Sequence, residues 1–209
     1  MILSLIILYV VTLVYLSITE RFRHYATLMT YQGWLLLLIA LLRLHSIHWF
    51  DLLFVVTETL IFKAIVVPMM LRRIIKHNRI NRVQPAGRSQ FGSLVMSIVA
   101  LVASACITYL VADDSINQAF FCVSLYALLS GLILIVMRRR LFAHLVGFLT
   151  IENGVFLFSM AMGVEMPILI NTAILLDIVM SILLLGMFLT KIGDRIKVDD
   201  TESLTSVKD

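Results

Sequence analysis

Seven long apolar stretches determine the fold class of this chain. Each is long enough, or nearly so, to cross about 30 Å of hydrocarbon as a helix. They span 1–18, 26–42, 51–71, 91–111, 119–137, 141–161 and 167–189. Alternating apolar and polar strand patterns are absent, and backbone groups in lipid must be hydrogen-bonded within their own segment. With 61% hydrophobic and 14% charged residues, the sequence predicts an all-α polytopic membrane protein rather than a soluble domain.

The basic residues predict the orientation of these helices. Fifteen of the 17 Lys and Arg residues lie at one membrane face, in 19–25, 72–90, 138–140 and 190–209. The positive-inside rule places that face in the cytoplasm. We therefore expect the N-terminus outside and the C-terminus inside, as seven crossings require. Because these residues are topology signals at helix ends, we expect a lipid bilayer and no nucleic acid as a partner.

The chain divides by pattern into two membrane parts and a tail. We predict a four-helix part over 1–111, a three-helix part over 112–192 and a cytoplasmic tail over 193–209. The first stretch has no preceding basic residue and no cleavage site, so it is expected to be a retained helix rather than a signal peptide. The segment 72–90 is basic, contains proline and glycine, and predicts a cytoplasmic loop that contacts anionic lipid or docks a cytoplasmic partner.

Two acidic residues, Glu152 and Asp177, lie near the middle of the last two apolar stretches. They are about 13 and 15 Å from the same end of their helices, and a short link makes those helices neighbours. A charged side chain at mid-bilayer costs about 2.5–3.5 kcal/mol, so two at one level indicate proton or ion handling. Desolvation disfavours the carboxylate, and we expect Glu152 to be partly protonated. The alternative is that both acids only hold helices together through hydrogen bonds.

The third stretch adds Glu58 and Lys63. A weak parallel repeat between the first three and the last three stretches places Glu58 opposite Asp177. Glu58 and Lys63 are about 140° apart around an α-helix, so Lys63 is expected to find its partner elsewhere. It could lie near an aqueous path, neutralise an acid of a neighbouring subunit, or extend to the membrane surface. Pro68 leaves a carbonyl near residue 64 without its donor and predicts a kink.

The sixth stretch carries three further candidates. His144 lies near its cytoplasmic end, as an interfacial residue or as a proton donor to Glu152 about 12 Å along the helix. Gly147 and Gly154 are seven residues apart and predict a small-residue stripe that lets another helix approach closely.

Sequence motifs indicate no catalytic or metal chemistry in this chain. GxSxG, HExxH, P-loop and GxGxxG patterns are absent, and Cys106 and Cys122 form no CxxC motif or Cys/His cluster. We therefore expect no cofactor, no metal site and no catalytic residue.

The stretch 119–209 resembles the K-type subunit of respiratory complex I and the C-type subunit of multisubunit Na⁺/H⁺ antiporters. Glu152 in TIENGVFLF and Asp177 in INTAILLDIVMSILLLG match the two mid-helix acids of those proteins. The second acid is commonly Glu in the K-type subunit. Asp177 therefore has a shorter side chain than the usual residue but carries the same carboxylate group. Over nearly its whole length the chain more closely resembles hydrogenase-4 component E, through ENG at 152–154, the FKAIVVP segment and the tail ESLTSVK.

This resemblance implies a membrane subunit of formate hydrogenlyase or a related group 4 nickel–iron hydrogenase. Other subunits would carry the metal centres and the antiporter-like channels, and this chain would link them by proton conduction in the cytoplasmic (inner) membrane of a bacterium or archaeon. Glu152 and Asp177 would be the relay acids, with Glu58, Lys63 and His144 as lesser candidates; the resemblance assigns no role to Glu58. The alternatives are a subunit of a Na⁺/H⁺ antiporter without a redox partner and a purely structural anchor.

Overall fold

The computed structural model describes residues 1–43, 59–77, 90–111, 116–138, 141–162 and 186. These residues form six α-helices and one π-helical segment: α1 Ile2–Ile18, α2 Phe22–Arg43, η1 Thr59–Val66, α4 Val67–His77, α5 Gln90–Leu110, α6 Gln118–Met137 and α7 Leu141–Met162. The predicted all-helical class is confirmed. The helices α2, α5, α6 and α7 are long and apolar enough to cross a membrane, and α1 is a shorter apolar helix. The predicted span 167–189 lies outside the described residues, apart from Gly186.

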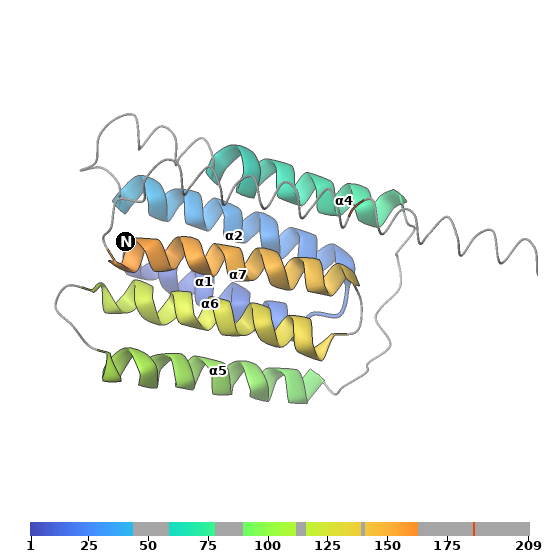
Figure 1. The fold of residues 1–209 in the computed structure, drawn as a ribbon. Helices are drawn as coiled ribbons and strands as arrows, with labels where there is room; N and C mark the ends of the chain where they lie inside the picture. Colours follow the sequence, from blue (N-terminus) through green and yellow to red (C-terminus); the bar gives the residue numbers. More distant parts are fainter. Residues whose placement is uncertain (44–58, 78–89, 112–115, 139–140, 163–185, 187–209) are drawn as a thin grey trace, which may run out of the picture.

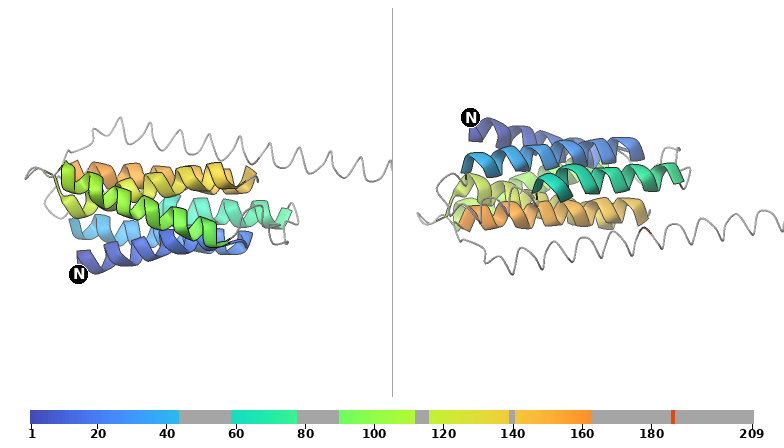
Figure 2. Two further views of the ribbon diagram at one scale, coloured as in Figure 1. Left: turned by 90° about the horizontal axis from the view of Figure 1, so that it is seen from below. Right: turned by 90° about the horizontal axis from the view of Figure 1, so that it is seen from above.

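The helices run side by side along one common direction (Figures 1 and 2). The η1–α4 segment packs on α2 at one edge, and α5 packs on α6 and α1 at the other. At one end of the bundle α1, α4 and α6 finish and α2, α5 and α7 begin. We call it the basic end, because it carries Arg21, Arg23, Arg72, Arg73, Lys76 and Arg138. The N-terminus lies at the opposite end (Figure 1).

Two apolar clusters hold the bundle together. The cluster nearer the basic end contains Phe22 and Phe142, whose rings meet edge to face with their centroids 5.2 Å apart. The second cluster contains Tyr9, Tyr126 and Leu157 and lies farther into the bundle. Each cluster joins helices from the first and the second predicted membrane part.

Glycines bring α6 and α7 into backbone contact. A Cβ atom at Gly131 would lie 2.5 Å from the Gly147 carbonyl oxygen, and one at Gly147 would lie 2.8 Å from the Gly131 carbonyl oxygen. A Cβ at Gly154 would lie 3.0 Å from the Leu128 backbone nitrogen. The predicted small-residue stripe on the sixth stretch is therefore confirmed, and Gly131 is its counterpart on α6.

The third predicted helix ends later than expected. Its helical residues continue to His77, so the predicted loop 72–90 is wrong over 72–77. Leu71 and Ile75 are buried while Arg72 and Lys76 are exposed, which is the periodicity of an amphipathic helix. The basic side chains of this last turn extend from a helix whose inner face still packs on α2.

Candidate functional site

A buried ion pair joins η1 to α7. The Lys63 Nζ lies 2.9 Å from the Glu152 Oε1, and the two residues are 5% and 9% exposed. The same ammonium lies 4.4 Å from the centroid of the Phe156 ring, one helical turn after Glu152. The aromatic face and the carboxylate therefore both stabilise the positive charge of Lys63 in the interior of the bundle.

The backbone around Lys63 is π-helical and tightly packed. The segment Thr59–Val66 ends immediately before α4, in which Pro68 is the second residue. Pro68 has no backbone N–H to donate to the preceding turn, so the kink expected near residue 64 takes the form of a π-helical segment. On the facing helix, a Cβ atom at Gly33 would lie 2.5 Å from the Lys63 carbonyl oxygen. Glycine at this position allows α2 and η1 to contact each other through their backbones.

Polar side chains of α1 and α2 are buried in the same bundle, and one of them, Tyr9, interacts with Glu152. Tyr9 and Gln32 are fully buried, and Tyr9 lies within electrostatic range of Glu152. The Gln32 Nε2 donates to the Thr12 Oγ1 over 3.3 Å, and the Thr12 hydroxyl donates to the Tyr9 carbonyl. Within the described part of the chain, the Tyr9 hydroxyl and the Gln32 Oε1 have no hydrogen-bond partner. Such buried atoms are the usual binding positions of internal water.

The predicted site residues have different outcomes. Glu152 is buried, as predicted, and Lys63 finds its partner elsewhere on the chain, as predicted. That partner is an acid of this chain, which the sequence did not identify. The prediction that Glu152 is partly protonated took only its burial into account. The structure also places the Lys63 ammonium 2.9 Å from the Glu152 Oε1. Glu58 and Asp177 lie outside the described residues.

His144 lies near the basic end, with its Nε2 2.6 Å from the Arg138 carbonyl oxygen. Its two predicted roles, as an interfacial residue and as a proton donor to Glu152, both stay predictions. Eight residues separate His144 from Glu152, a rise of about 12 Å along α7. No group of three or more His, Cys, Asp or Glu side chains suited to a metal ion occurs in the described ranges.

The ion pair can exchange a proton internally. Transfer of a proton from the Lys63 ammonium to the Glu152 carboxylate, across the 2.9 Å between Nζ and Oε1, converts two buried charges into two neutral groups. Both states are compatible with a water-poor interior, whereas a single remaining charge is not.

Comparisons with protein-family models, with curated proteins and with solved structures find no match to this chain.

Proposed function

We propose that this protein is an integral membrane subunit of a group 4 nickel–iron hydrogenase complex and relays protons through Lys63 and Glu152. The observation that carries the relay is the 2.9 Å ion pair between two buried side chains on separate helices. The hydrogenase assignment is supported by the sequence resemblance described above.

The relay operates by alternating the charge of the pair. Glu152 accepts a proton from one side of the site and becomes neutral. The Lys63 ammonium then lacks a counter-ion, and burial without one favours its release of a proton to the other side. Transfer of the proton from Glu152 to the neutral Lys63 amine restores the ion pair. One proton has then crossed the site, and no charge remains unpaired in the bundle.

The remaining candidates would extend this relay in both directions. Asp177, on the stretch that follows α7, would receive or supply protons on one side, and Glu58 would do so before η1. His144, beside the basic end, would exchange protons with the cytoplasm in the proposed orientation. The partners would be antiporter-like membrane subunits and the peripheral hydrogenase subunits of the same complex.

A Glu152→Gln variant tests the relay in the intact complex. It keeps the size and hydrogen-bonding capacity of the side chain but cannot accept the proton. We expect the variant to be less stable, because Lys63 loses its partner, but still to assemble, and we expect proton translocation per hydrogen evolved to fall at least about tenfold. Glu20→Gln, which removes a carboxylate at the basic end, is the matched control and should leave coupling unchanged. Unchanged coupling in an assembled Glu152→Gln complex would refute the relay.

Two other functions give different results. A subunit of a Na⁺/H⁺ antiporter would co-purify with antiporter subunits, without hydrogenase subunits, and would support Na⁺-dependent proton exchange. The backbone contact of Gly147 with α6 also fits a structural anchor. An anchor would tolerate Glu152→Gln and Asp177→Asn, while bulky substitutions at Gly147 would disrupt assembly.

A further inference from the structure

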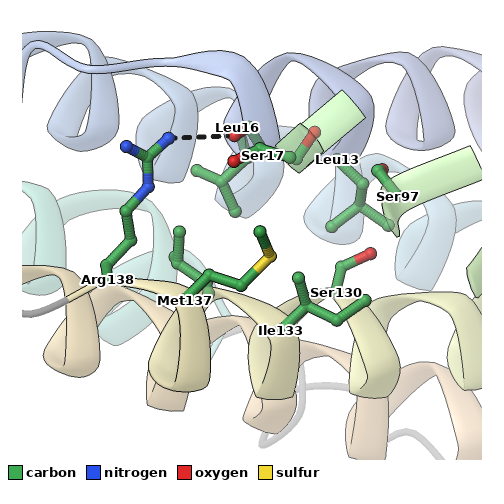
Figure 3. A pocket seen from close by; sticks show the side chains of 10 residues that line it. Leu13, Leu16, Ser17, Ser97, Ser130, Ile133, Met137 and Arg138 are labelled. Carbon is green, nitrogen blue, oxygen red and sulfur yellow. Dashed lines mark hydrogen bonds between the residues drawn. The ribbon is translucent and has the colours of Figure 1, made fainter. Parts of the chain in front are cut away.

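The basic end of the bundle has a large excess of positive charge. Among the described residues it carries the six Arg and Lys side chains named above and one carboxylate, that of Glu20. Arg138 is 7% exposed, and its Nη2 donates to the Ser17 and Thr19 carbonyl oxygens over 3.1 and 3.2 Å. It lies beside a small cavity between α1, α5 and α6 (Figure 3). The other five basic side chains are exposed, so most of the excess charge lies at the surface.

Three of these exposed cations lie along the seam between α2 and α4. The two helices pack on each other and run in opposite directions, so the first turns of α2 lie beside the last turns of α4. The Arg72 Nη2 donates to the Thr30 Oγ1 over 3.5 Å, which places a guanidinium at the seam. Lys76 lies one turn after Arg72, and Arg23 lies two turns before Thr30, on the same helix faces.

The cations of α4 are weakly satisfied by the protein. Neither Arg72 nor Lys76 has an ion-pair partner within the described ranges. The bond from Arg72 to Thr30 is made to a neutral hydroxyl and is longer than the usual range of about 2.7–3.2 Å. A guanidinium presents several N–H donors in a planar fork that matches the oxygens of a phosphate. Arg72 therefore retains donors for an anion at the seam.

Farther from the basic end, the same two helix faces become apolar. Large apolar side chains are exposed along them, and these are Trp34 and Leu38 on α2 and Ile61, Ile65 and Met69 on η1 and α4. Trp34 lies one turn beyond Thr30, and tryptophan is enriched where a membrane meets water. Apolar exposure alone is expected of any lipid-facing helix. The change from cations through an indole to aliphatic side chains is the order of phosphate, glycerol and acyl chains in a phospholipid.

We propose that the surface over the α2–α4 seam binds an anionic glycerophospholipid. Its phosphate lies on Arg72 and Lys76, and its acyl chains lie along Trp34 and Ile65. Basic sites between membrane helices favour anionic headgroups, whereas the choline group of a neutral phospholipid adds a cation to this cluster. A free phosphate ligand would leave the apolar part of the surface uncovered. The site rests on the membrane placement in the proposed function, but it requires neither the hydrogenase assignment nor the proton relay.

Quenching of Trp34 fluorescence by brominated phospholipids tests this site on the full-length chain in liposomes. The chain has two tryptophans, so Trp49→Phe leaves the indole of Trp34 as the source of the signal. Brominated phosphatidylglycerol and brominated phosphatidylcholine with identical acyl chains compete for the surface. The ratio of their binding constants follows from the quenching at several mole fractions. We expect phosphatidylglycerol to bind at least about tenfold more tightly.

Charge-removing variants assign this preference to the seam. Arg72→Gln keeps a donor for Thr30 but removes the charge, and it should lower the preference about fivefold. Adding Lys76→Gln should remove most of the remainder. Arg21→Gln removes an exposed charge from the α1–α2 connection at the same end, and this matched control should leave the preference unchanged. Equal quenching by the two lipids in the unmodified chain, or a preference that survives the double variant, would overturn the site.

The same assay separates the lipid from other occupants. Millimolar glycerol 3-phosphate carries the phosphate without acyl chains and should not displace the lipid; complete displacement would mean that the surface recognises phosphate alone. If the double variant kept its lipid preference but lost peripheral subunits during purification of the complex, the surface would dock protein instead. Quenching by neither lipid would contradict the membrane placement itself, whereas equal quenching by both contradicts the lipid site alone.

Discussion

Removing one charge of the Lys63–Glu152 pair should destabilise this protein far more than removing both. At 2.9 Å and an effective dielectric constant of about 20, the attraction between the charges is about 6 kcal/mol before desolvation. Breaking a buried pair from one side typically costs about 3–5 kcal/mol, whereas replacing both partners is often nearly neutral. For a chain of this size, the cost of removing one partner corresponds to a fall of about 6–20 °C in the midpoint of thermal unfolding.

A double-mutant cycle measures this effect. Lys63→Met, Glu152→Gln and the double variant are purified in the same detergent, and their unfolding midpoints are compared with that of the unmodified chain. We expect each single variant to show most of the predicted fall in the unfolding midpoint. The double variant should recover at least half of that fall. If the double variant loses the sum of the two single effects, the side chains do not stabilise each other and the reasoning is refuted. The same double variant separates stability from transport, because a relay without titratable groups should assemble and remain uncoupled.

Further predictions concern the packing of the bundle. Gly147→Val should lower the free energy of unfolding by at least about 1–3 kcal/mol, because its Cβ would overlap α6. A Cβ at Gly92 meets no neighbouring atom, so Gly92→Val should change the free energy of unfolding by no more than about 0.5 kcal/mol. Gly33→Ala should push η1 away from α2 and lower assembly of the complex, measured by native gel; normal assembly would contradict the close contact. Tyr126→Phe should cost about 1 kcal/mol, because the Ser97 hydroxyl loses its partner; a midpoint equal to that of the unmodified chain would show that this bond contributes nothing.

Hydropathy was sufficient to locate the helices because apolar length is a local property. Six predicted stretches contain helix in the structure, and the ends that fall in described residues differ from the predicted ones by a few residues. The largest differences are at the basic end, where α2 begins at Phe22 and α4 continues to His77. There, charged residues extend from the surface of a helix whose buried face is still apolar. Hydropathy averaged over a window misses such a turn, whereas the spacing of Leu71 and Ile75 would have indicated it.

The partner of Lys63 could not be predicted from the sequence. Glu152 is far from it along the chain, and their contact depends on how η1, α2 and α7 pack. The π-helical form of η1 was also missed. Pro68 predicts a missing hydrogen bond, but the form of the distortion depends on the backbone contact with Gly33. Gly131 could have been found as a small residue in an apolar stretch, although pairing it with Gly147 requires knowing which helices are neighbours.

The distance between Lys63 and Glu152 along the chain has a consequence for biosynthesis. Roughly 90 residues separate them, so at roughly 5–20 residues per second the ribosome makes the acid roughly 5–20 seconds after the lysine. If the η1–α4 segment crosses the membrane as the sequence predicts, η1 would carry an uncompensated charge during that interval, which costs about 2.5–3.5 kcal/mol at mid-bilayer. The segment would then enter the bilayer as a marginal helix and become a stable one only when α7 is made. A chain that ends between η1 and α7 should therefore fail to retain the η1–α4 segment in the membrane.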